Sequence, residues 1–147
     1  MFATLAGCHR RPYSHTLEQP NEQVAKIEIC QFHYHEKHEL RSFTPLKTLN
    51  EQETADILAD IPELVGYRQL GDVGLDYGEI VVIITYKDNT SEVLGVWNVG
   101  IIDRDGNLST HSGYFEKVGF SKMLLKYIDE DLVPEKYREW AAQELPE

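Results

Sequence analysis

The chain has 147 residues, enough for one domain with a buried core, and 41% of them are hydrophobic. It carries 25 acidic and 14 basic residues, which gives a formal net charge of -11 at pH 7. This balance argues against nucleic acid or anionic lipid as a direct ligand of the folded body, because phosphate binding needs clustered lysine and arginine. No apolar run approaches the length of a membrane span. A basic protein or a cation fits this charge better. We therefore expect a body folded in water, whose partner is an unknown protein or a small ligand.

Leu5-Ala6-Gly7-Cys8 matches a lipobox, the site at which a bacterial signal peptidase cuts before a cysteine that then carries a lipid. Only four residues precede it, whereas a signal peptide needs a basic region and an apolar region of about 7–15 residues. Either the start is truncated or misassigned, or the match is accidental. Residues 9–23 are polar and contain two prolines, which is typical of a tether, although a frayed cytosolic N-terminus has the same composition. We expect residues 1–23 to be a signal remnant and tether, with the membrane reached only through a lipid on Cys8.

The body is expected to be a single α+β domain over residues 24–147. Residues 24–35 are rich in β-branched and aromatic side chains and predict a strand, whose apolar face switches near Cys30. A bulge at this point, or burial of both faces, would explain the switch. Further on, Asn50 and Glu53 form a capping-box pattern that predicts a helix over residues 51–60.

Residues 79–86 give the strongest strand signal, and because both of their faces are apolar we expect a central strand. The runs 91–98 and 99–103 follow, and Asp105-Gly106 then favours a hairpin turn, so residues 79–112 predict an antiparallel meander. A helix near residues 120–128, capped by Ser121, and a short helix opened by Pro134 complete the pattern. The expected fold is an antiparallel meander sheet of about four to five strands, with two or three helices packed on one face.

His33, His35 and His38 form the densest cluster of possible metal ligands. A strand would place His33 and His35 on one face about 7 Å apart, a spacing compatible with two ligands to one metal, and His38 or Glu39 would add a third. The alternative is a solvated cluster at a strand end. His15 falls in the expected tether and is assigned no role of its own.

The sequence contains neither the phosphate-binding glycine patterns nor the serine nucleophile elbow, and its acidic loops do not complete a calcium-binding pattern. Cys30 lies in a predicted strand, where a thiol is usually buried and inert. We therefore expect a chain that is not an enzyme and that carries no cofactor.

Four aromatic residues are candidates for an interface because large rings add contact area at a low entropy cost: Tyr77, Trp97, Tyr114 and Trp140. The leading hypothesis is a non-enzymatic binding module, the soluble domain of a small extracytoplasmic lipoprotein anchored through Cys8. The alternative is a cytoplasmic acidic protein that neutralises a basic one, as immunity proteins neutralise toxins. A divalent-metal-binding protein is a further alternative.

Overall fold

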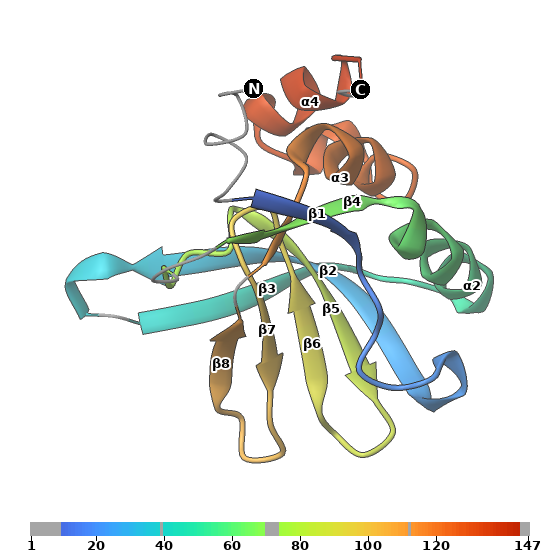
Figure 1. Ribbon diagram of the computed structural model, residues 1–147, viewed down its shortest axis with the longest axis vertical. Helices are drawn as coiled ribbons and strands as arrows, with labels where there is room; N and C mark the ends of the chain where they lie inside the picture. Colours follow the sequence, from blue (N-terminus) through green and yellow to red (C-terminus); the bar gives the residue numbers. More distant parts are fainter. Residues whose placement is uncertain (1–9, 39, 70–73, 112, 145–147) are drawn as a thin grey trace.

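The computed structural model describes residues 10–38, 40–69, 74–111 and 113–144. These ranges form two antiparallel sheets and three α-helices (Figure 1). The larger sheet has six strands in the order β3-β2-β5-β6-β7-β8, and the smaller sheet has three in the order β1-β4-β9. The predicted α+β class is confirmed, and the main sheet is larger than the four to five strands expected.

The elements have the following bounds. The strands are β1 (Arg10–Ser14), β2 (Val24–His35), β3 (Leu40–Thr48), β4 (Val65–Gln69), β5 (Ile80–Tyr86), β6 (Ser91–Leu94), β7 (Val99–Ile102), β8 (Leu108–His111) and β9 (Tyr114–Phe115). The helices are α2 (Glu51–Asp60), α3 (Lys117–Leu124) and α4 (Glu135–Ala141), with 3-10 turns η1 (Asn21–Gln23), η2 (Glu36–His38), η3 (Ile61–Glu63) and η4 (Glu130–Leu132). Within the described ranges, no helix is long and apolar enough to cross a membrane.

β5 lies between β2 and β6, and apolar side chains cover both of its faces. Ile80, Val82 and Ile84 belong to the main core cluster, to which all three helices contribute side chains. Val81 and Ile83 belong to a second, smaller cluster to which no α-helix contributes a buried side chain. The predicted central strand is confirmed, as are the helices on one face of the sheet.

The apolar pattern of β2 changes face at a register shift between Ile29 and Cys30 in its pairing with β3. Before the shift Ile27 and Ile29 face the main cluster, and after it Cys30 and Phe32 face the smaller one. Side chains alternate normally through this point, because residues 27–31 pair with β5 without interruption, so burial of both faces accounts for the switch. The extra residue at the register shift is Leu46 of β3, and the alternative of a bulge in residues 24–35 is wrong.

The meander from β5 to β8 is formed as expected, but β6 ends at Leu94, four residues before the predicted end. Gly95 starts a tight loop in which its N–H donates to the carbonyl of Asn98. A Cβ atom on Gly95 would lie 2.2 Å from the carbonyl oxygen of Tyr77, so the backbone approaches too closely here for any other residue.

The helix predictions hold for α2 and need one correction for α3. Asn50 and Glu53 form the complete capping box at the start of α2. The N-cap of α3 is Glu116, whose carboxylate accepts from the N–H groups of Val118 and Gly119. The predicted Ser121 cap is wrong, because Ser121 lies inside this helix and is fully buried.

Four of the described strands, β1, β3, β4 and β9, fall where the sequence pattern predicts none. β3 is an edge strand that contains Pro45, and β1 contains Pro12, so both carry a residue that lowers strand propensity. β1 pairs with β4 along its whole length, from Arg10 opposite Gln69 to Ser14 opposite Val65. The described part of the expected tether therefore packs on the body instead of extending from it.

Candidate functional site

Glu92 is a carboxylate buried within the larger sheet. It lies on β6 opposite Ile84 of β5 and Ile101 of β7, so its side chain shares a face with these two isoleucines. Ile84 belongs to the main core cluster, and Glu92 itself is only 3% exposed. Burying a carboxylate is costly unless hydrogen-bond donors surround it. Glu92 must therefore be satisfied by polar partners.

Three donors meet the carboxylate of Glu92. His15 Nε2 lies 2.9 Å from Oε2, and the backbone N–H of Glu18 donates to Oε1 over 2.6 Å. The hydroxyl of Tyr86 donates to Oε1 in a short hydrogen bond. Because an ionised carboxylate only accepts, Nε2 of His15 carries the proton in this contact. Two of the three donors come from the segment that follows β1, so the carboxylate attaches this segment to the sheet.

Tyr86 is a stable donor in this cluster. Burial raises the pKa of its hydroxyl well above the ordinary value, and the hydrogen bond to Glu92 and the charge of that carboxylate raise it further. The phenol therefore stays protonated throughout the neutral range and keeps its hydrogen bond to Glu92.

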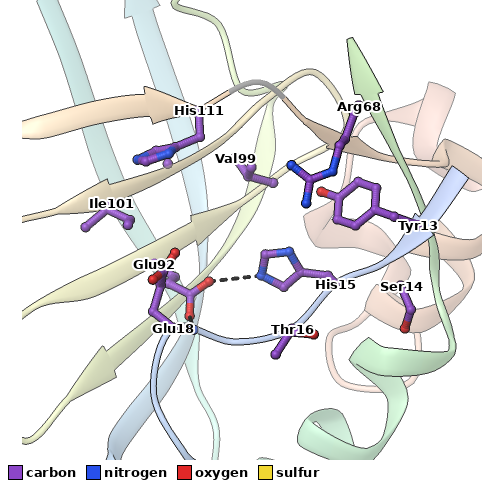
Figure 2. Close-up of a pocket in the computed structure, with 11 residues that line it drawn as sticks. Tyr13, Ser14, His15, Thr16, Glu18, Arg68, Glu92, Val99, Ile101 and His111 are labelled. Carbon is purple, nitrogen blue, oxygen red and sulfur yellow. Dashed lines mark hydrogen bonds and ion pairs between the residues drawn. The ribbon is translucent and has the colours of Figure 1, made fainter. Parts of the chain in front are cut away.

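The imidazole of His15 is held by aromatic side chains as well as by Glu92. Its ring meets Phe115 edge to face at a centroid distance of 5.4 Å, and Tyr13 at 6.3 Å. The side chain is 11% exposed. These contacts fix the ring in one orientation, with Nε2 directed at Glu92 (Figure 2).

A cavity of about 200 Å³ lies beside the pair of His15 and Glu92 (Figure 2). The N-terminal segment forms one wall, and the strands β4, β6, β7 and β8 form the other. The lining residues are Tyr13, Ser14, His15, Thr16 and Glu18 from the segment, and Arg68, Glu92, Val99, Gly100, Ile101 and His111 from the strands. Apart from Val99, Gly100 and Ile101, the lining consists of polar or charged side chains and one tyrosine ring.

Arg68 brings a positive charge to the mouth of this cavity. Its guanidinium lies over the ring of Tyr13, 4.7 Å from the centroid, and Figure 2 shows it directed toward the same space as the His15 ring. Among the described residues, no carboxylate lies within ion-pair distance of Arg68. The charge of Glu92, by contrast, is already met by three donors. The cavity therefore has one cationic group whose hydrogen-bonding capacity toward an anion is unused.

Two glycines make room for the tyrosine ring that supports Arg68. A Cβ atom on Gly66 would lie 2.9 Å from Cε1 of Tyr13, and one on Gly113 would lie 2.8 Å from its hydroxyl oxygen. Burial raises the pKa of Tyr13, while the nearby charge of Arg68 acts in the opposite direction. Tyr13 is thus an uncharged ring held in a fixed position, and the guanidinium of Arg68 packs against it.

The predicted metal cluster is only partly assembled. His33, His35 and His38 are all exposed, at the end of β2 and in the turn that follows it. The rings of His35 and His38 stack at a centroid distance of 4.7 Å. The described residues hold no group of three or more histidine, cysteine, aspartate or glutamate side chains placed to bind a metal. Glu39 lies outside the described residues, and metal binding at this cluster stays a prediction.

The four residues named as a possible interface separate into three environments. Tyr77 is fully buried, and its hydroxyl bonds to the Thr110 hydroxyl at 2.8 Å, so this residue belongs to the core and is not available to a partner. Tyr114 is half-buried against Tyr67. Trp97 is 43% exposed and meets the half-buried Trp140 edge to face at 6.4 Å. Only the tryptophan pair forms an accessible aromatic surface.

The structure describes one of the two cysteines, Cys30. Cys8 lies outside the described residues, so its lipidation stays a prediction. Cys30 is buried, and this burial raises the pKa of its thiol to about 12. A thiol of this kind is a packing residue and a poor nucleophile, as its position in a strand predicts.

No protein-family model, curated protein or solved structure matches this chain. The site therefore has to be understood from its own geometry. Sequence reasoning missed all of its polar residues, because His15 was placed in a tether and Arg68 lay in no predicted element. One signal was available: Glu92 is a charged residue at the start of a predicted strand that otherwise carries Val93, Leu94, Val96 and Trp97.

Proposed function

We propose that this chain is a non-enzymatic binding module that holds a small anionic molecule in the cavity beside His15 and Glu92. The observation that carries the proposal is the guanidinium of Arg68 at the cavity mouth, which meets no carboxylate in the part of the chain that the structure describes. Arg41 and Arg138 also lack a carboxylate partner among the described residues, but Arg41 donates to the Thr110 hydroxyl and Arg138 to two backbone carbonyls, whereas the guanidinium of Arg68 has no protein acceptor there. A bound carboxylate or phosphate would supply the missing partner.

The overall charge of the chain does not oppose a ligand of this kind. A net charge of -11 disfavours long polyanions, which contact a wide surface, whereas a small anion in a cavity responds mainly to the groups around it. The nearest buried carboxylate, Glu92, is screened by the donors Tyr86, His15 and Glu18. Among the described residues, Arg68 is the one lysine or arginine that lines the cavity, and the side chain of Glu18 lines it as well.

The cavity volume limits the size of the ligand. A cavity of roughly 150 Å³ holds benzene, and the present one measures about 200 Å³. A short carboxylic acid or a phosphate group fits this space. The guanidinium of Arg68 would donate hydrogen bonds to two oxygens of the ligand. The ring of His15 lines the same space, with its Nε2 directed at Glu92. Val99 and Ile101 would contact an apolar part of the ligand.

We further propose that the module works outside the cytoplasm, anchored through a lipid on Cys8. The support is the sequence Leu5-Ala6-Gly7-Cys8. If the anchor exists, the protein partitions with membranes in its host, and Cys8→Ser releases it. An unchanged distribution of this variant would favour the cytoplasmic alternative.

A protein-binding role is the second candidate, and the exposed pair of Trp97 and Trp140 favours it. Lys117 and Lys136 lie over the Trp140 ring at 5.2 Å and 5.9 Å from its centroid. An immunity-type function requires a basic partner, and these lysines do not attract one, although Lys136 is itself paired with Glu79. This surface therefore gives the immunity-type alternative no support.

The binding proposal is tested by calorimetric titration with acetate, succinate and inorganic phosphate, with glycerol as a neutral probe. At least one of the anions is expected to bind, and glycerol is not. Arg68→Gln should weaken the binding at least tenfold, since it removes the charge-assisted contact. Arg104→Gln is the matched control, because Arg104 is an exposed arginine in the turn between β7 and β8, outside the cavity. Equal affinities of the two variants would contradict the proposal.

A further inference from the structure

Residues 15–19, here called the strap, cross the larger sheet without forming a helix or a strand. Cavities lie on both sides of the strap. The ligand cavity of about 200 Å³ separates it from β7 and β8, and a second cavity of about 480 Å³ separates it from Leu58 and Pro62. Ser14, His15, Thr16 and Glu18 line both cavities. The strap therefore has little packed protein on either flank.

A small set of polar contacts holds the strap in place. His15 and the backbone of Glu18 bind the carboxylate of Glu92. Gln19 adds a second attachment, because its Nε2 donates to Asp88 at 3.0 Å and to Thr90 at 3.1 Å. Two strap residues contact the main core cluster: Leu17 packs against it, and the ring of His15 meets its member Phe115. Segments with few apolar contacts open at lower free energy than the core of the domain.

We propose that the strap is a closing element of the ligand site, and that anion binding and strap docking stabilise each other. This inference rests on the proposed function, because it concerns the same cavity. A ligand in the cavity touches the strap on one side and Arg68 on the other, so it adds a contact between the strap and the strands to those that His15, Glu18 and Gln19 already make. Opening of the strap removes His15 and one wall of the site. The ligand then binds the docked state more tightly than the open state, and linkage requires that it favour docking.

This coupling predicts a measurable protection of the strap. The N–H of Glu18 is bonded to Glu92 only while the strap is docked, so its hydrogen exchange reports local opening. With an anion present at one hundred times its Kd, exchange at Glu18 is expected to slow about a hundredfold. The experiment uses the full chain and whichever of acetate, succinate and inorganic phosphate binds most tightly.

A variant that loosens the strap without altering the cavity makes the test specific. Gln19 does not line the ligand cavity, and Gln19→Ala removes both of its contacts to the turn between β5 and β6. This variant should exchange faster at Glu18 when no anion is bound. If it leaves the strap docked one tenth of the time, its apparent Kd for the anion should rise about tenfold. Gln23→Ala, in the exposed turn η1, should change neither quantity.

Arg68→Gln provides the opposite case. It should weaken the binding of the anion without changing the hydrogen exchange of the Glu18 N–H in the ligand-free protein. If an anion binds but leaves exchange at Glu18 unchanged, the strap coupling is overturned and the binding function stands. The coupling is equally overturned if Gln19→Ala speeds exchange with no change in Kd. If none of the three anions binds, both proposals fall together.

Discussion

His15 and Glu92 meet across 77 positions of sequence, with Nε2 of the imidazole 2.9 Å from Oε2 of the carboxylate. The contact joins the segment after β1 to the third-from-last strand of the larger sheet, and the candidate ligand cavity lies beside it. Glu92 is thus a structural residue and a boundary of the site at the same time.

Removing the charge of Glu92 should destabilise the fold. In Glu92→Gln the amide NH₂ faces groups that themselves donate, so the hydrogen bonds from His15, Glu18 and Tyr86 are not all replaced. We expect a loss of about 2–4 kcal/mol in the free energy of unfolding, measured by urea denaturation. Glu22→Gln, in the exposed turn η1, is the control and should change this quantity by less than about 0.5 kcal/mol. Similar midpoints for the two variants would show that Glu92 is not the attachment point.

Charge on either face of β5 should be equally disruptive. Val82 is fully buried in the main cluster and Ile83 is 8% exposed in the smaller one. Val82→Asp and Ile83→Asp should each cost several kcal/mol of stability, because an unpaired carboxylate replaces an apolar side chain. Lys87→Gln, at the exposed turn after the strand, serves as the neutral control. Asp88 is unsuitable for this purpose, since it accepts hydrogen bonds from Thr90 and Gln19. A native-like melt for either aspartate variant would mean that this face of the strand is open to water.

The thiol of Cys30 should be inert in the folded protein. Burial, and to a lesser extent the charge of Glu28, raises the pKa of Cys30 to about 12, so very little thiolate exists at pH 8. In a Cys8→Ser background, iodoacetamide should leave the native chain unmodified and should alkylate Cys30 completely in urea. Mass spectrometry distinguishes the two products. Rapid alkylation without denaturant would place Cys30 at an accessible position, in conflict with the packing of β2.

Stability should decrease in acid through carboxylates at the turns and caps. Hydrogen bonds from Thr90 lower the pKa of Asp88, those from Asn107 lower the pKa of Asp103, and the Lys47 ammonium lowers the pKa of Glu53. A carboxyl group whose folded pKa lies below its unfolded value stabilises the fold above the unfolded value, about 4, and this stabilisation is lost as pH falls through the folded value. The urea midpoint should therefore decrease steadily below about pH 4.

The variant Asp103→Asn isolates one of these groups. In this variant the urea midpoint should decrease less steeply below about pH 4, the acid limb of the curve of stability against pH, because the asparagine does not titrate. Asp131→Asn, on the exposed turn η4, is the comparison and should leave the limb unchanged. Identical acid limbs for Asp103→Asn and the parent chain would rule out a contribution from this turn.

Local patterns predicted the parts of the fold that depend on neighbouring residues. The capping box of Asn50 and Glu53, the two buried faces of β2 around Cys30 and the apolar faces of β5 are all encoded within a few positions of sequence. Ser121 was misread because a serine next to an apolar run resembles a cap, whereas the carboxylate of Glu116 performs that role one turn earlier.

The candidate site depends on contacts that no local pattern records. β1 becomes a strand only because β4 supplies its partner, and His15 gains a role only because Glu92 lies opposite it in space. Arg68 is informative through the absence of a nearby carboxylate among the described residues, which is a property of the assembled fold. The location of the site therefore required the tertiary structure.

The most direct test of the account is a nuclear magnetic resonance titration of the ¹⁵N-labelled chain with acetate, succinate and inorganic phosphate. For an anion that binds, we expect saturable shifts at the side chain of Arg68, the imidazole of His15 and the amides of Gly100 and Ile101, with one common Kd. The resonances of the indole N–H groups of Trp97 and Trp140 should not shift, because these residues lie outside the cavity lining. Saturable shifts confined to the tryptophans, or no saturable shift with any of the three anions, would contradict an anion site beside His15 and Glu92.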